Sequence, residues 1–204
     1  MSKKIVLIGG GGHAGVVIDA IATSGEFEIF GIIDPGIAAG VSIKGISVLG
    51  NDDILKEVYA SGVRNAFITK GSIGDPGIRI KLYELARAIG YGFPFIMHPK
   101  ANVSADARIG EGSFIAASAT VVTGTVVGRN AIINTSASVD HDSVIADFVH
   151  VSPGAILCGG VNVGARTHIG AGAIIVQNVK IGTDCFINAG AIVSKNVADN
   201  EKVR

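Results

Sequence analysis

A repeat of six residues runs through the second half of the chain. Counting in sixes from Val103 to Val193, all sixteen positions are valine, isoleucine or leucine, without a change of register. Four residues after each of these aliphatics stands a small or β-branched residue, from Ala107 to Val197. A period of six fits neither an α-helix nor an uninterrupted strand, so it predicts short strands separated by regular corners.

The two phases of the repeat predict a triangular prism. The small residue and the next aliphatic are two apart and face inward from one strand, and the residue between them faces outward. Three strands make a coil of eighteen residues, so residues 103–198 give a little over five coils. The position after the aliphatic is often glycine, which we interpret as the requirement of a tight corner. These glycines are Gly110, Gly128, Gly164, Gly170 and Gly182.

Composition agrees with thin, repeated layers of small side chains. The chain has 29 glycines, no tryptophan and 5% aromatic residues, yet 48% of it is apolar. A β-solenoid that serves only as a structural or binding surface remains an alternative at this point.

Residues 1–98 have a different pattern, in which strands alternate with helices. We predict strands at Ile5–Ile8, Phe27–Ile33 and Asn65–Thr69, and helices at about Val16–Thr23, Asp52–Ala60 and Ile78–Ile89. This alternation is typical of a small parallel α/β sheet, so a Rossmann-like domain is expected before a β-helix domain at 99–204.

A glycine motif follows the first predicted strand. Gly10, Gly12 and Gly15 match G-x-G-x-x-G, and Asp34 follows about twenty residues later. Bare backbone N–H groups at a helix N-terminus favour a phosphate, which NAD and a nucleotide sugar both offer. About 95 residues hold only half of a dinucleotide fold, which favours a single nucleoside diphosphate. Glycines that serve only a tight turn are the structural alternative.

Charge and hydropathy exclude several partners. The chain has 17 basic and 17 acidic residues and no basic run, so a nucleic-acid partner is not expected. The apolar run Ile5–Ile8 is too short for a signal peptide or a membrane span. The two cysteines, Cys158 and Cys185, cannot form a disulfide framework. A cytoplasmic protein without a membrane partner is expected.

The histidines are the candidate catalytic residues. His150 and His168 are eighteen residues apart and should stack on adjacent coils, whereas His141 lies half a coil before His150. His141 and His150 should therefore point apart within one chain and could meet across a subunit boundary, which predicts a homotrimer. No two histidines are four or five residues apart, so we expect no zinc site. His98 and His168 are interpreted as surface or satisfied residues.

The chain resembles nucleotide-sugar N-acetyltransferases of the sialic acid O-acetyltransferase-like hexapeptide-repeat family. The resemblance rests on the segments 132–142 and 147–155, on Gly-Gly-His-Ala-Gly at 11–15, on His98-Pro99 and on the repeat. It implies a left-handed parallel β-helix. It also implies transfer of acetyl from acetyl-CoA, a cosubstrate, to a UDP-linked 4-amino-4,6-dideoxysugar by direct attack of the amine, without an acyl-enzyme.

The same resemblance implies roles for individual residues of the β-helix. His141 would be the general base, for which an imidazole suits because its pKa lies near neutrality. Asp142 would orient or polarise that imidazole. Asn134 and His150 would lie along the acetyl-CoA arm, and the backbone of Gly159 would bond to pantetheine.

In the N-terminal domain the resemblance implies that Gly11, Gly12 and His13 meet the diphosphate and that Asp34 meets the uridine end. The family has Ile-Gly-Asn after the third strand, where this chain has Ile68-Thr69-Lys70-Gly71-Ser72. Lys70 would add a phosphate contact there, and Gly71 would border the nucleotide sugar.

The sequence ends at Glu201-Lys202-Val203-Arg204, before the Gly-x-Pro-Ala-Lys/Arg tail common in these enzymes. Either part of the CoA pocket is missing from these residues or the chain is truncated. The alternatives for function are O-acetylation of sialic acid or another sugar, a GDP- or dTDP-linked acceptor, and a non-catalytic nucleotide-sugar-binding solenoid.

Overall fold

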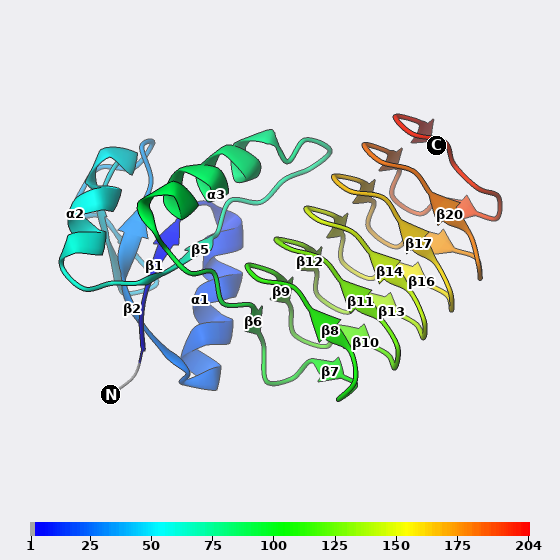
Figure 1. Ribbon diagram of the computed structural model, residues 1–204, viewed down its shortest axis with the longest axis horizontal. Helices are drawn as coiled ribbons and strands as arrows, with labels where there is room; N and C mark the ends of the chain where they lie inside the picture. Colours follow the sequence, from blue (N-terminus) through cyan, green and yellow to red (C-terminus); the bar gives the residue numbers. More distant parts are fainter. Residues whose placement is uncertain (1–2) are drawn as a thin grey trace. The chain divides into compact units, whose positions relative to one another are not determined.

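The computed structural model describes residues 3–204 and consists of two compact units. The first unit contains the residues up to Gly71 together with Gly77–Ile96 (Figure 1). The second contains Met97–Arg204 and a short loop, Ser72–Pro76. No helix within residues 3–204 is long and apolar enough to cross a membrane.

The first unit is an α/β domain built on a five-stranded sheet. Its strand order is β3-β4-β2-β1-β5, with all neighbours parallel except β3 and β4. The strands are β1 (Lys3–Ile8), β2 (Phe27–Ile33), β3 (Ser42–Ile43), β4 (Ile46–Gly50) and β5 (Asn65–Ile68). Ile5 to Ile8 of the inner strand β1 are all buried, as a parallel sheet covered on both faces requires.

The hairpin β3–β4 was missed by the sequence analysis. Its turn, Lys44-Gly45, has positive φ at both residues (46° and 82°), the conformation that joins two tightly paired antiparallel strands. Apolar and polar residues alternate on both sides of this turn, in Val41-Ser42-Ile43 and Ile46-Ser47-Val48, so the sequence carries a hairpin signal that the analysis overlooked.

The helices are α1 (Gly12–Ser24), the 3₁₀ helix η1 (Asp52–Ile54), α2 (Leu55–Ala60) and α3 (Gly77–Ile89). Helix α1 begins four residues before the predicted start at Val16, so Gly12 and Gly15 lie inside the helix. It ends at Gly25, whose φ of 68° and N–H bond to the Ile21 carbonyl form a left-handed C-cap.

The second unit is a left-handed parallel β-helix, which confirms the predicted fold class. Its two-residue strands form three sheets, seen as stacked coils in Figure 1. The first sheet holds β7 (Asn102–Val103), β10 (Thr120–Val121), β13 (Ser138–Val139), β16 (Ile156–Leu157), β19 (Ile174–Ile175) and β22 (Ile192–Val193). The second holds β8 (Arg108–Ile109), β11 (Val126–Val127), β14 (Val144–Ile145), β17 (Asn162–Val163) and β20 (Lys180–Ile181). The third holds β6 (Ile96–Met97), β9 (Phe114–Ile115), β12 (Ile132–Ile133), β15 (His150–Val151), β18 (His168–Ile169), β21 (Phe186–Ile187) and β23 (Lys202–Val203).

The register of these sheets confirms the predicted coil. Ile132 pairs with His150 and His150 with His168, each eighteen residues further on. All sixteen aliphatics of the repeat are buried except Val103 and Ile109 of the first coil, which are partly buried against the same core.

The last coil is two residues shorter than the others. Phe186 pairs with Lys202, and Ile181 bridges to Val197, each sixteen residues further on. Val197 is buried, as predicted, but it stacks on an aliphatic of the repeat and not on a small-phase residue.

The interpretation of the glycines after the aliphatics as tight-corner residues is wrong. None of the five has a left-handed φ; that conformation recurs two residues later, at every sixth residue from Gly112 to Gly190. A Cβ atom on Gly110 would instead lie 2.5 Å from the backbone carbon of Gly128 on the next coil. The close approach of successive coils therefore accounts for these glycines.

Candidate functional site

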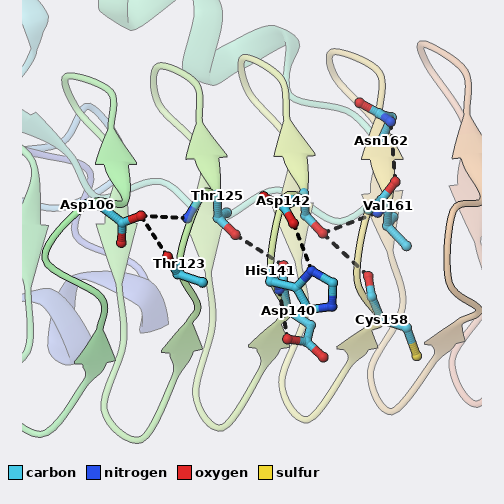
Figure 2. A network of polar contacts seen from close by, with 12 residues as sticks. Asp106, Thr123, Thr125, Asp140, His141, Asp142, Cys158, Val161 and Asn162 are labelled. Atoms are coloured by element: carbon cyan, nitrogen blue, oxygen red, sulfur yellow. Dashed lines mark hydrogen bonds and ion pairs between the residues drawn. The ribbon is translucent and has the colours of Figure 1, made fainter.

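His141 and Asp142 form a pair on the corner between β13 and β14 (Figure 2). The Nδ1 atom of His141 lies 2.9 Å from Oδ2 of Asp142. Asp142 occupies the left-handed position of its hexad, with a φ of 57°. Because Nδ1–H donates to the carboxylate, the neutral imidazole has its free lone pair on Nε2.

The groups around this corner stabilise the protonated form of the His141 imidazole relative to an imidazole in water. The hydrogen bond that Nδ1–H donates to Asp142 raises the pKa of His141 above its ordinary value. Desolvation opposes this shift, and the charges of Asp140 and Asp142 add to it. Asp140 also accepts a 2.7 Å hydrogen bond from the backbone N–H of His141. The side chains of His141 and Asp142 are 47% and 74% exposed, so the pair is open to a ligand.

Gly159 lies against the imidazole of His141. A Cβ atom on Gly159 would meet Nε2 of that ring at 2.4 Å. The backbone joins the same two coils, because the N–H of the next residue, Gly160, donates to the His141 carbonyl at 2.8 Å. The structure therefore brings together three of the predicted site residues, His141, Asp142 and Gly159.

Asn134 and His150 form a second group. Nδ2 of Asn134 is 3.2 Å from Nε2 of His150, and Nδ1 of His150 is 2.6 Å from the carbonyl of Ser72. The ring therefore donates from Nδ1 and accepts at Nε2. His150 points away from the prism axis, as predicted, yet it is only 9% exposed. The carbonyl of Ser72 belongs to the loop Ser72–Pro76, which the sequence analysis did not connect with His150.

A pocket of about 380 Å³ opens beside this second group. Its lining includes Asn134, His150, Ser152, His168, Phe186 and Ile73. It contains neither His141 nor Gly159, so one chain keeps the two groups of predicted residues apart.

His168 belongs to this pocket and is not a surface residue, so that part of its interpretation is wrong. It is buried, stacks on Phe186 with ring centroids 4.9 Å apart, and meets His150 edge-on at 5.1 Å, as the eighteen-residue spacing predicted. Burial lowers the pKa of His168. Its Nδ1 is buried and has no hydrogen-bond partner within residues 3–204. His98, in contrast, is buried and satisfied, since its Nδ1 accepts from Lys100 N–H at 3.0 Å.

In the α/β unit the glycine motif divides into two kinds of position. A Cβ atom on Gly10 would clash with Ile37 and Ile43, whereas Gly11 and Gly12 have nothing within 4 Å of theirs. Packing therefore explains Gly10 and does not explain Gly11 and Gly12.

Asp34 holds this loop in place. Its Oδ2 accepts from Gly10 N–H at 2.7 Å and its Oδ1 from Gly36 N–H at 2.8 Å. Both oxygens therefore already serve the backbone around the glycine motif.

A small cavity of about 80 Å³ lies next to this loop. Gly9, Asp34, Asp52 and Lys70 contribute to its lining. Burial and the neighbouring Asp34 raise the pKa of Asp52, and Lys70 opposes this shift. Sequence reasoning missed Asp52, and only the unpredicted strand β4 before it could have pointed to it. The remaining predicted residues, His13 and Gly71, face each other: a Cβ on Gly71 would lie 3.6 Å from Cβ of His13.

The described residues 3–204 contain no group of three or more His, Cys, Asp or Glu side chains placed to hold a metal ion. A β-helix of six-residue repeats with an exposed histidine–carboxylate pair on one corner is the architecture of a hexapeptide-repeat acyltransferase.

The comparisons with known proteins agree with this class. Residues 4–86 match the family model of the PglD N-terminal domain. The comparison with curated proteins gives no match.

Similar structures extend the likeness to the rest of the chain. An H141N variant of perosamine N-acetyltransferase from Caulobacter crescentus, in complex with CoA and GDP-perosamine, is 36% identical over 96% of this chain and 90% of that one, with a TM-score of 0.91. The acetyltransferase domain of PglB from Neisseria gonorrhoeae, in complex with acetyl coenzyme A, is 34% identical over 99% of this chain and 96% of that one, with a TM-score of 0.91. WeeI from Acinetobacter baumannii, at 23% identity and a TM-score of 0.80, shares the fold. The chain belongs to this family of sugar N-acetyltransferases, as the sequence resemblance predicted.

Proposed function

We propose that the chain transfers the acetyl group of acetyl-CoA to the amine of a nucleotide-linked amino sugar, with a UDP-linked 4-amino-4,6-dideoxysugar as the acceptor. Acetyl-CoA-dependent N-acetylation of an amino sugar follows from the family, whose members bind CoA with GDP-perosamine or acetyl coenzyme A. The observation that carries the proposal in this chain is the exposed pair of His141 and Asp142, whose Nδ1 and Oδ2 atoms lie 2.9 Å apart.

In the proposed reaction the amine attacks the thioester carbonyl directly. The nitrogen–carbon bond forms, the carbon–sulfur bond breaks, and CoA leaves as its thiolate. Nε2 of His141 takes the proton that the amine loses, while Asp142 holds the ring and stabilises the imidazolium through Nδ1–H. In the Caulobacter relative the structures with CoA and GDP-perosamine include variants with a histidine replaced by Asn or Ala.

The acetyl-CoA arm is assigned to Asn134, His150 and the backbone of Gly159. The pocket beside Asn134 and His150 supports this assignment, since pockets with a few convergent polar groups are the usual ligand sites. Because His150 is held by Ser72 and Asn134, its ring is already fixed before a ligand binds.

The nucleotide diphosphate is assigned to Gly11, Gly12 and His13, with Lys70 and Gly71 at the edge of the same site. The open space above Gly11 and Gly12 supports this, because bare backbone at the N-terminus of α1 is suited to an anion. Asp34 would act chiefly by fixing the loop, since both of its oxygens are bonded to backbone. A GDP-linked acceptor is the second candidate, which the complex of the Caulobacter relative with GDP-perosamine favours.

A homotrimer is part of the proposal. One chain keeps His141 with Gly159 apart from Asn134 with His150, and a neighbouring subunit could bring the second group to the first. We place the enzyme in the cytoplasm, in keeping with two cysteines that are both free. Sedimentation that shows a fully active monomer would contradict the trimer.

The function is tested by measuring thiol release from acetyl-CoA with a panel of UDP-, dTDP- and GDP-linked amino sugars, and with sialic acid as a hydroxyl acceptor. We expect turnover with a UDP-linked 4-amino sugar. If sialic acid is the one acceptor that is turned over, the reaction is O-acetylation and the proposed N-acetylation is wrong. Calorimetry with NADH is expected to give no binding, and tight binding would contradict the nucleotide-sugar assignment of the glycine loop.

A further inference from the structure

The pair His141–Asp142 lies between two glycines on adjacent coils. Thr123-Gly124 occupies the same corner one coil before the pair, and Gly159 one coil after it, each eighteen residues away along the chain. A Cβ atom on Gly124 would lie 2.4 Å from Oδ1 of Asp142, and one on Gly159 would lie 2.4 Å from Nε2 and 2.5 Å from Cε1 of His141. The carboxylate of Asp142 therefore lies against Gly124 of the preceding coil, and the imidazole of His141 lies against Gly159 of the following coil.

We infer that Gly124 and Gly159 are positioning residues, which set the orientation of the His141–Asp142 pair by having no side chain. This inference rests on the proposed role of His141 and is distinct from any backbone contact of Gly159 with the cosubstrate. In both cases the atoms that a methyl group would meet are the ends of side chains. At Gly159, whose φ is not left-handed, the imidazole would move and the backbone would not, so function is affected more than folding.

The hexad position of Gly159 does not itself demand glycine. Five other hexads have alanine at this position: Ala105, Ala117, Ala165, Ala171 and Ala189. Gly159 is absent from the positions with left-handed φ. The backbone at 159 can therefore accept alanine, and the imidazole of His141 is the obstacle.

Gly124 has a φ of 72°, so alanine there adds backbone strain to the contact with Asp142. Gly112 offers a matched control: its φ is 68°, and a Cβ would lie 2.7 Å from Oδ1 of Asn130, away from the pair. The variant Gly112→Ala thus has the same strain and a similar contact without touching the proposed site.

The experiment is an NMR titration of histidine-labelled protein, with the His141 signal assigned from a His141→Asn variant, together with steady-state kinetics. In Gly159→Ala and in Gly124→Ala we expect the pKa of His141 to fall, because the ring loses the Asp142 hydrogen bond that raises it. We expect kcat to fall by up to about 10²-fold, the scale of a 1 Å misplacement. Gly112→Ala should leave both unchanged. In the His141→Ala background, Gly159→Ala should cause no further loss of kcat.

An unchanged pKa of His141 in both variants would overturn the inference, even if activity fell, and so would an equal pKa shift in Gly112→Ala. The NMR titration measures the pKa of His141 without substrate, so its result does not depend on the proposed catalytic role. If His141→Ala keeps its kcat, the proposed base is wrong, while a lowered pKa in Gly159→Ala would still support the positioning role.

Discussion

Two sets of glycines, one in each unit, have opposite surroundings. In the β-helix, a methyl group on Gly110, Gly128, Gly159 or Gly164 would meet atoms of the next or the preceding coil within 2.6 Å. In the α/β unit, a methyl group on Gly11 or Gly12 would meet nothing within 4 Å. The chain's own packing thus explains the first set and does not explain Gly11 and Gly12, which is why the proposal assigns them to the diphosphate.

The largest effect is expected at His141, whose imidazole lies against Gly159. We expect His141→Ala to lower kcat by about 10²–10⁴-fold, because a general base acts in the transition state. Binding of acetyl-CoA should hardly change. Steady-state kinetics and calorimetry with acetyl-CoA measure the two effects separately.

His150→Ala supplies the contrast. It removes the bonds to Asn134 and Ser72, so we expect weaker acetyl-CoA binding with a smaller change in kcat. A near-normal kcat in His141→Ala would mean that the amine loses its proton to another group or to water.

A smaller effect is expected for Asp142→Asn, which keeps the ring but weakens its orientation. Asp142 raises the pKa of His141, so the wild-type base is protonated and inactive below that raised pKa. In the variant the pKa falls, and the acid limb of the kcat/KM profile should move to lower pH while the plateau drops. If the acid limb of the Asp142→Asn profile does not move, the group that titrates in this limb is not His141.

Gly128→Ala tests the stacking explanation for the β-helix glycines. A Cβ there would lie 2.7 Å from the backbone nitrogen of Asp147, so we expect a loss of about 1–3 kcal/mol in the free energy of unfolding, as for other overpacked sites. Urea unfolding measures it. A variant as stable as the wild type would show that the coils can separate at this edge without cost.

Gly12→Ala should have the smallest effect on stability, since its methyl group enters open space at the start of α1. The unfolding free energy should stay the same or rise by up to about 1 kcal/mol, the difference in helix propensity. Binding of the nucleotide sugar should weaken about tenfold, or 1.4 kcal/mol. If binding measured by calorimetry is unchanged, the diphosphate does not approach Gly12.

The sequence could predict the β-helix because each of its residues repeats one of six environments. The sixteen aliphatics therefore identified the core and the eighteen-residue coil. It could not locate the glycine contacts, which arise between residues eighteen apart on neighbouring coils. The shortened last coil was hidden as well, because Val197 fits either phase of the repeat.

For the candidate site, adjacency along the chain decided what could be predicted. His141 and Asp142 are neighbours in sequence, so their contact was expected. The bond between His150 and Ser72 joins residues 78 apart, and no periodic signal links that loop to the β-helix. The α/β unit has no repeat, so the start of α1 and the hairpin β3–β4 depended on local signals alone.

The eighteen-residue coil also limits how the length of such a chain can change. An insertion or deletion of eighteen residues adds or removes one layer, shifts the C-terminal end by about 4.8 Å, the spacing of paired strands, and keeps every side chain on its face. A change of six residues would keep the core phases but turn each later residue onto the next face. Between Asn134 and His150, such a change would separate the two side chains. Length variants should therefore be tolerated in whole coils.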